Sequence, residues 1–332
     1  MRAPSADPHW SYRGLHAVVL DNGLTTAVVL PELGGKIWEL RDGRSGRQFL
    51  WHNPRTAPYR PAFGSSYDDQ FFGGWDVLFP NDIPEELAGE PYPDHGEVWA
   101  SSWDWHIERH PDRVALAMEL AAPISGARLR TTICLEAGHA GLILDQELAN
   151  PTSSALPYLW KHHVALNVNE PARIDLPDAR MELAEFGNPR AGGPGTRYRW
   201  PYLEDEDQQH DMRRTLPAHS GVCEFQYATD LAAGWCALGY DDGSGLGLAF
   251  DTNIFDSCWT FASYGGWRDH RVAVLEPCSG SPVSVSDGIA AGTHRTLQPG
   301  ELLRTRLVAT TFTGIRAVEE ISASGIVTGA PL

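Results

Sequence analysis

The chain lacks the features that mark several common classes of protein. No apolar run approaches the roughly 18 residues of a membrane-spanning helix, and the start of the chain has no apolar core of signal-peptide length. The five cysteines are scattered, without a Cys-x-x-Cys pair. We therefore expect reduced, mostly buried thiols and a cytoplasmic location. Convincing helical periodicity is nearly absent from the 332 residues.

Basic residues are also scarce. Lys and Arg total 26 against 43 Asp and Glu, so the formal net charge is −17, and only Lys36 and Lys161 are lysine. Without a basic stripe to neutralise phosphates, a nucleic-acid partner is not expected. A glycine-rich nucleotide-binding motif is missing as well, and we expect no cofactor.

The sequence is rich in short strand-like runs separated by turn residues, of which Gly (33) and Pro (24) are the most frequent. Asn22-Gly23 between residues 16–20 and 25–30 predicts a tight hairpin, because this pair accepts the positive φ that such turns need. A second hairpin is expected from 36–40 and 48–51, and a short helical turn at 314–324. Further strands are expected at 98–109, 113–120, 127–136, 141–150, 164–168, 235–240, 246–251, 272–276 and 302–312. This pattern predicts an all-β sandwich.

Residues 185–220 depart from this rhythm. They are rich in Gly, Pro and charge, and we expect an irregular excursion rather than a linker between domains. An exposed loop and a lid over a binding site are both open interpretations of this segment.

Three polar segments interrupt the apolar runs, and a fourth follows paired glycines. Gly73-Gly74 precedes Trp75, whose ring could stack on a sugar, and Asp76, which could accept hydroxyl hydrogen bonds; a core tryptophan after a bend is equally compatible. Asp94 beside His95 can fix the imidazole tautomer and raise its pKa, although a surface histidine in a turn fits too.

The segment Lys161-His162-His163 stands between apolar residues. On a strand, its two histidines point to opposite faces, so one is expected to face a pocket and the other to pack or orient. One solvated histidine and one histidine satisfied in the core fit this segment equally well. Glu276 ends an apolar run and precedes Pro277, which is typical either of a solvated strand end or of a rigidly held catalytic base.

Taken together, these segments resemble the galactose mutarotase-like proteins of the aldose 1-epimerase superfamily, over residues 15–315. The matching motifs, in the family's order, are Leu30-Pro-Glu-Leu-Gly-Gly-Lys-Ile37, Gly73-Gly-Trp-Asp-Val-Leu-Phe-Pro-Asn81, Pro93-Asp-His-Gly-Glu-Val-Trp99, residues 160–167 and Leu275-Glu-Pro277. The resemblance implies one β-supersandwich domain over residues 1–332, with an open carbohydrate cleft.

The resemblance also implies residue roles. His163 corresponds to the family's general acid for the ring oxygen, and Glu276 to the base for the anomeric hydroxyl. His95 resembles the family's substrate-contacting histidine, and with it we predict Trp75, Asp76, Lys161 and His162 as substrate-binding residues. The expected reaction interconverts α and β anomers of a small-molecule carbohydrate, without metal or cofactor and away from membranes.

The sequence departs from the family at several points. Ala165-Leu166 replace an aromatic pair, Glu97 replaces a glycine, and the family's additional substrate-binding Asp could correspond to Asp230 or Asp251. Two alternatives therefore stay open. One is a carbohydrate-binding protein without catalysis, and the other is a metal-assisted sugar isomerase or lyase that uses His95, His163 and Glu276 as ligands.

Overall fold

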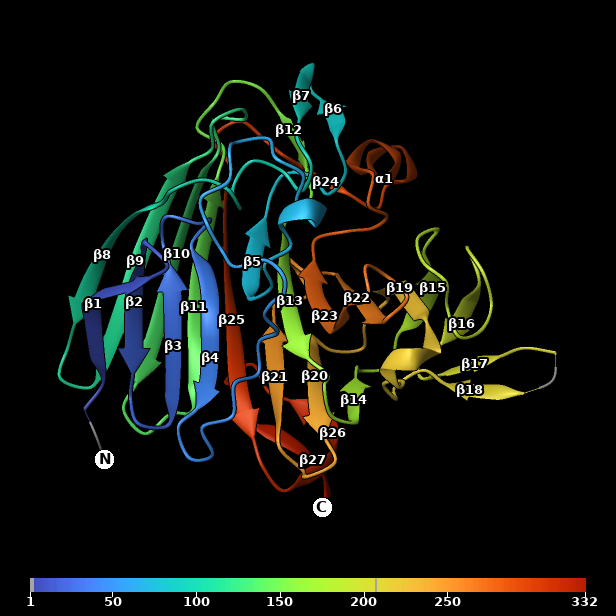
Figure 1. Cartoon of the computed structure of the whole chain (residues 1–332). Coiled ribbons are helices and arrows are strands. Elements are labelled where there is room, and N and C mark those ends of the chain that lie inside the picture. Colours follow the sequence, from blue (N-terminus) through green and yellow to red (C-terminus); the bar gives the residue numbers. More distant parts are fainter. Residues whose placement is uncertain (1–2, 207) are drawn as a thin grey trace. The chain divides into compact units, whose positions relative to one another are not determined.

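The computed structural model describes residues 3–206 and 208–332. Mostly antiparallel β-sheets and one α-helix make up these residues (Figure 1), which confirms the all-β prediction. Residue 207, within the predicted excursion, lies outside the described residues. Over the part that is described, no helix has the length and apolar character needed to cross a membrane.

The chain forms two compact units. Unit 1 contains Met1–His163 and Ser279–Leu307, and unit 2 contains Val164–Cys278 and Val308–Leu332. Two of the three divisions fall inside strands, β13 (Lys161–Asn167) and β25 (Leu302–Phe312), and the third falls at the end of β23 (Arg271–Cys278). The single domain expected from the sequence stays a prediction.

Unit 1 carries two antiparallel sheets. The first has the order β1 (Ser5–Tyr12), β2 (Leu15–Asp21), β3 (Thr25–Leu30), β4 (Lys36–Asp42), β5 (Trp75–Leu78), and the second β8 (Asp104–Arg109), β9 (Arg113–Ala121), β10 (Arg128–Glu136), β11 (Gly141–Ala149). The smaller elements are β6 (Glu85–Leu87), β7 (Glu90–Tyr92), η1 (Asp68–Gln70), β12 (Leu156–Tyr158), β24 (Arg295–Leu297) and α1 (Val285–Ala291).

The predicted Asn-Gly hairpin is confirmed in β2 and β3. Gly23 has a φ of +83°, and Asn22 Oδ1 accepts hydrogen bonds from the backbone N–H groups of Leu24 and Thr25. The Asn22 amide also donates to the carbonyl oxygens of Glu136 and His139, at 2.7 and 2.8 Å. One side chain therefore shapes its own turn and ties it to the β10–β11 turn of the other sheet.

Unit 2 is also antiparallel and has its own core. One group of strands has the order β23 (Arg271–Cys278), β22 (Ser257–Tyr264), β19 (Val222–Thr229), β15 (Arg180–Leu183), β16 (Arg197–Arg199), β17 (Tyr202–Glu204), β18 (Gln209–Asp211). The others are β14 (Ala172–Asp175), β20 (Trp235–Tyr240), β21 (Gly245–Phe250), the hairpin β26 (Ile315–Ile321) and β27 (Val327–Pro331), and the short η2 (Ala218–Ser220). A buried cluster around Trp235 and Phe312 packs against this hairpin.

Four predictions about secondary structure were wrong in part. Residues 314–324 contain strand β26, not a helical turn. The expected strand 98–109 begins only at Asp104, and the second hairpin's partner 48–51 is reduced to isolated bridges, of which Arg41↔Gln48 is one. The excursion 185–220 is not irregular throughout, because β16, β17 and β18 pair in antiparallel fashion within it.

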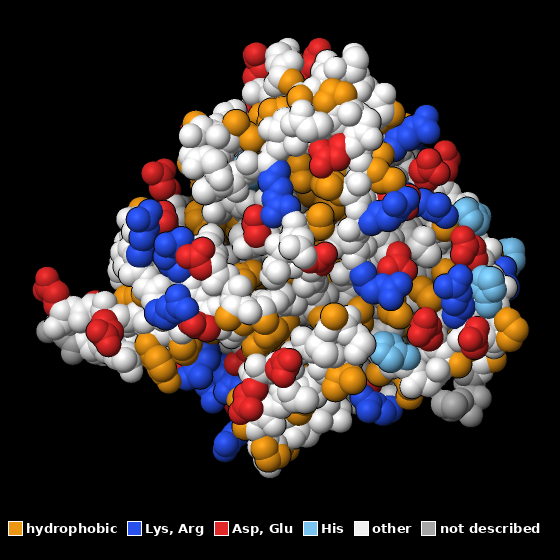
Figure 2. All heavy atoms as spheres, turned by 180° about the vertical axis from the view of Figure 1, so that it is seen from behind, with side chains coloured by type: hydrophobic (Ala, Val, Ile, Leu, Met, Phe, Trp, Pro, Cys, Tyr) orange, Lys and Arg blue, Asp and Glu red, His pale blue; other side chains and the backbone are white. Residues whose placement is uncertain are grey.

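The surface and the cysteines agree with the composition. Figure 2 shows one face of the molecule, on which acidic and basic side chains are interspersed without a large patch of either sign. All five cysteines are buried thiols outside any disulfide, as expected.

Candidate functional site

Strand β13 places two adjacent histidines on opposite faces, as predicted. The Trp75 indole donates to His162 Nδ1 at 2.9 Å, and His162 Nε2 lies 2.8 Å from Gln146 Oε1. His163 faces the other way, with its Nδ1 3.1 Å from the Tyr67 hydroxyl. The alternation of side chains along a strand explains the separation. His163 is 7% exposed and His162 fully buried.

The Tyr67 hydroxyl connects His163 to a buried ion pair. Tyr67 Oη is 2.7 Å from Asp76 Oδ2, which is also 2.5 Å from Lys36 Nζ. Lys36 donates in addition to the Gly73 carbonyl oxygen at 2.8 Å. The other carboxylate oxygen, Asp76 Oδ1, is buried and has no hydrogen-bond partner in the described structure. Lys36, Asp76, Tyr67 and His163 thus form one continuous chain of hydrogen bonds.

A second network surrounds His95. His95 Nδ1 is 2.7 Å from Asp94 Oδ1, and His95 Nε2 is 3.4 Å from Asp82 Oδ1. Asp82 Oδ2 lies 2.5 Å from Lys161 Nζ. Asp94 therefore contacts the His95 imidazole, which is one of the two arrangements that the sequence left open.

Tyr67 also contacts the second network. Its backbone N–H donates to Asp94 Oδ2 at 2.7 Å, and its ring stacks on His95 with a centroid distance of 4.1 Å and an interplanar angle of 14°. The same ring meets His163 edge-on at 5.3 Å. One tyrosine therefore fixes both histidines. Sequence reasoning missed it, because Tyr67 lies in a loop without periodicity or motif.

The pKa of His163 is lowered well below its ordinary value. Burial is the main cause, followed by the positive charges of Lys161, His95 and Lys36. Removing an imidazole from water disfavours its charged form, and nearby cations do the same. His163 is therefore neutral at pH 7. A histidine that acts first as a general acid would instead be expected to carry a positive charge before the reaction.

The pKa of His95 moves in the opposite direction. Burial acts to lower it, but the charge of Asp82 and the hydrogen bond with Asp94 outweigh burial, and the pKa is raised. With His95 protonated, this region of unit 1 has three cations and three carboxylates. These are Lys36, Lys161, His95, Asp76, Asp82 and Asp94.

The backbone around His95 is unusual. His95 has a φ of +58° and Gly96 a φ of +79°, so two successive residues are left-handed. A Cβ at position 96 would lie 2.1 Å from the Phe79 carbonyl oxygen. That close approach lets the backbone N–H of Glu97 donate to the same oxygen at 2.9 Å. The glycine thus holds the His95 loop against the end of the segment that carries Asp76.

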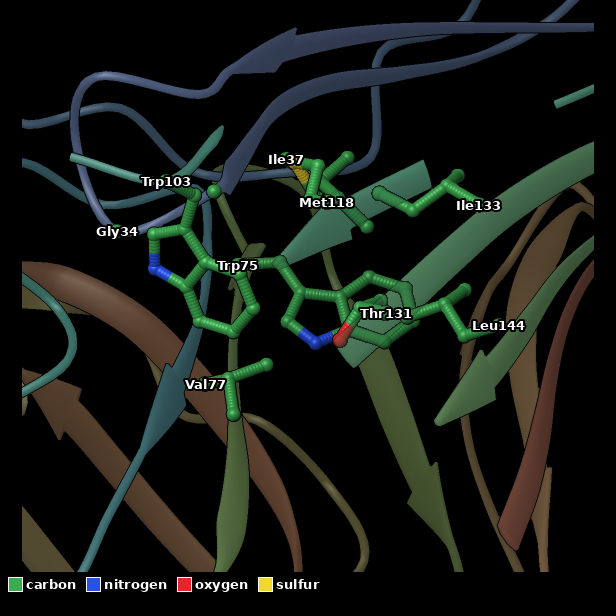
Figure 3. A pocket seen from close by; sticks show the side chains of 10 residues that line it. Gly34, Ile37, Trp75, Val77, Trp103, Met118, Thr131, Ile133 and Leu144 are labelled. Carbon is green, nitrogen blue, oxygen red and sulfur yellow. The ribbon is translucent and has the colours of Figure 1, made fainter. Parts of the chain in front are cut away.

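Trp75 and His162, both predicted to contact the substrate, are buried in the core, and their contacts with a substrate stay predictions. Trp75 is 1% exposed and lines a small interior pocket with apolar side chains from β4, β9, β10 and β11 (Figure 3). Thr131 supplies the one side-chain hydroxyl of this lining. Burial lowers the pKa of His162 to about 3. Both residues are part of the core and support the strand that carries His163.

Two other charged residues have structural partners. Lys161, predicted to meet a substrate, is 1% exposed and paired with Asp82. Glu97, the residue after Gly96, accepts backbone hydrogen bonds from Ile124 at 2.5 Å and Ser125 at 3.2 Å. This explains a buried carboxylate beside the His95 loop. Substrate contacts of Asp76 and His95 stay predictions.

Glu276 belongs to unit 2. It is 1% exposed on β23, and its cross-strand neighbour on β22 is Trp259. Tyr227 and Phe225 lie against Trp259, with ring centroids 5.1 and 5.7 Å away. Glu276 thus lies next to a cluster of three aromatic side chains on neighbouring strands of its sheet. The role of Glu276 as a base stays a prediction.

The remaining candidates are less well supported. Asp230 is exposed and paired with Arg180, and Asp251 is exposed and accepts hydrogen bonds from Asn253. The described residues contain no group of three or more His, Cys, Asp or Glu side chains arranged to hold a metal ion.

Comparison with known proteins identifies the fold. No family model matches the sequence. A putative aldose 1-epimerase from Klebsiella pneumoniae has a similar structure, with a TM-score of 0.70 and 13% identity, over 93% of this chain and 83% of that one.

Two further solved structures agree. A putative aldose 1-epimerase from Escherichia coli K12 gives a TM-score of 0.65 at 16% identity, over 90% of this chain and 100% of that one. A galactose mutarotase-like protein from Clostridium acetobutylicum gives 0.65 at 13% identity, over 94% and 99%. At such identities the likeness concerns the fold, and the protein described here has the galactose mutarotase-like fold.

Proposed function

We propose that this protein is an aldose 1-epimerase that interconverts the α and β anomers of a neutral sugar through its open-chain form. The observation that carries the proposal is the buried, neutral His163, held by Tyr67 at the end of the hydrogen-bond chain from Lys36 and Asp76. An imidazole fixed in this way is suited to proton transfer. The fold shared with putative epimerases supports the same reaction class.

The chemistry needs two groups that exchange protons with the sugar. One removes the proton from the anomeric hydroxyl while the C1–O5 bond breaks, and the other protonates O5. The aldehyde then rotates, and ring closure reverses both transfers. His163 is one of this pair, and Glu276, predicted from the sequence, is the other.

The charges around His163 and His95 support a neutral substrate. Each of the three cations has a carboxylate partner, at 2.5 Å for both lysines. A phosphate or carboxylate on the sugar would have to displace one of these buried pairs, and breaking such a pair is strongly unfavourable. Neutral aldoses, including deoxy sugars, require no such exchange.

The test is anomeric exchange measured by NMR saturation transfer over a panel of neutral, deoxy and anionic sugars. We expect accelerated exchange for a neutral sugar, and a loss of about 10²–10⁴ in kcat for His163→Asn and for Glu276→Gln. His106→Asn and Glu320→Gln make the same chemical changes at exposed positions and should leave kcat unchanged.

The outcomes separate the alternatives. Exchange that stays at the uncatalysed rate for every sugar would refute the proposal. Sugar binding by calorimetry without exchange would then identify a carbohydrate-binding protein. Activity that a chelator abolishes would instead support the metal-assisted reading.

A further inference from the structure

The hydrogen bonds of Tyr67 determine which nitrogen of His163 carries a proton. A carboxylate paired with an ammonium group accepts hydrogen bonds and has none to donate. The 2.7 Å contact between Tyr67 Oη and Asp76 Oδ2 therefore contains the tyrosine's proton. Without that proton, two oxygens would face each other with their lone pairs.

A phenol has a single proton, so Tyr67 cannot also donate to His163. The 3.1 Å contact between Tyr67 Oη and His163 Nδ1 must use a proton on the imidazole. A neutral imidazole has one N–H, which places it on Nδ1 and leaves a lone pair on Nε2.

We infer that Tyr67 is a positioning residue that locks His163 in its Nδ1–H tautomer, so that Nε2 enters the reaction as a proton acceptor. The role in catalysis rests on the proposed epimerase function, whereas the tautomer does not. This reverses the direction expected from the family resemblance, in which His163 donates the first proton.

The step is balanced as follows. Nε2 of His163 takes the proton of the anomeric hydroxyl, C1–O1 becomes a carbonyl, and the C1–O5 bond breaks. O5 takes a proton from a carboxylic acid, for which Glu276 is the candidate. The new imidazolium donates through Nδ1 to Tyr67 and, by way of Tyr67, is stabilised by the charge of Asp76. Ring closure on the other face returns both protons.

The neighbouring His162 provides an internal reference. An indole N–H can only donate, so His162 Nδ1 accepts from Trp75 and the proton lies on Nε2, facing Gln146. Two adjacent histidines are thus expected in opposite neutral tautomers, which nitrogen chemical shifts distinguish directly.

The experiment uses the full chain labelled with ¹⁵N-histidine, with His163 assigned among the 13 histidines by its absence in His163→Asn. Long-range ¹H–¹⁵N correlation at pH 7 should show Nδ1–H for His163 and Nε2–H for His162. Tyr67→Phe removes the hydroxyl and should convert His163 to the Nε2–H form or a mixture, while His162 stays unchanged. Tyr59→Phe removes a hydroxyl that bonds Gln70 and should alter neither.

Anomeric exchange gives the second readout. Tyr67→Phe should lower kcat about 10–100-fold with KM little changed, because the imidazole stays in place with its proton on the wrong nitrogen. A wild-type His163 in the Nε2–H or charged form would overturn the inference. So would an unchanged tautomer in Tyr67→Phe. If the tautomer is as expected and no sugar is turned over, the proposed function fails and the assignment of the proton stands.

Discussion

Gly96→Ala should destabilise the protein far more than the same change at Gly89, although both glycines are left-handed. Gly89 has a φ of +85° and open space around its Cα, whereas Gly96 has a φ of +79° and lies against the backbone of Phe79. Alanine in a left-handed conformation costs about 1–2 kcal/mol at either position. The difference between the two variants therefore isolates the cost of the contact.

That contact cannot be relieved cheaply. The new Cβ would lie 2.1 Å from the Phe79 oxygen and 2.5 Å from its carbonyl carbon, so one backbone segment must move by about 1 Å. The movement breaks the buried hydrogen bond from Glu97 to Phe79, worth about 1–3 kcal/mol when its groups are left unsatisfied. We expect a total loss of at least about 3 kcal/mol for Gly96→Ala.

Urea unfolding followed by circular dichroism measures both variants, with m-values compared to confirm that the transition itself is unchanged. A second readout is the pKa of His95 by NMR, which should fall toward the ordinary value in Gly96→Ala as the loop that carries His95 moves away from Asp82. Equal losses of stability in the two variants, within about 0.5 kcal/mol, would refute this account of the loop.

Two further predictions concern the buried charges. The raised pKa of His95 contributes stability that is fully present below the unfolded pKa near 6.5 and is lost as pH rises through the folded value. As pH rises above about 6.5, the free energy of unfolding should therefore fall more in wild type than in His95→Asn; parallel pH curves would contradict this. Lys36→Met should lower the free energy of unfolding in urea by about 3–5 kcal/mol, because it leaves the buried Asp76 without its cation. Lys36→Met/Asp76→Leu should recover most of that loss. If the losses of the two single variants simply add in the double variant, the two residues are not coupled.

The strands were predictable where side-chain alternation and turn residues agree. Trp235–Tyr240 and Leu302–Phe312 have the expected bounds, and the Asn22-Gly23 turn identified its hairpin. Residues 314–324 were misread because their alternation is weak and a glycine stands at the start. The strand exists because Val318 and Ile321 pack into the cluster around Trp235, which is tertiary information.

Helix α1 was missed although the sequence carries its signals. Ser284 caps the N-terminus by accepting from the backbone N–H of Asp287, and Gly292 ends the helix in a left-handed conformation with a φ of +74°. With seven residues and little apolar periodicity, the segment offers no hydrophobic pattern between these caps. Caps alone are too common in loops to predict a helix this short.

The site was predictable only in part, for a related reason. His95 and His163 stood out because polar residues interrupt apolar runs, and the structure brings both against one tyrosine ring. Trp75 and His162 gave the same signal but satisfy each other in the core, since an indole N–H and an imidazole nitrogen are complementary. A sequence shows that a buried polar group needs a partner, but the fold decides whether that partner is a ligand or another side chain.

The two lysines make this point most clearly. In a chain that otherwise uses arginine for its positive charge, lysine occurs only at two buried carboxylates, Asp76 and Asp82. An ammonium group has three donors on a slender stem, and Lys36 places two of them on Asp76 and Gly73. A guanidinium in the same space would have five donors to satisfy in a rigid plane. Lysine at these positions is therefore a consequence of burial, and its charges add to the effect of burial in lowering the pKa of His163.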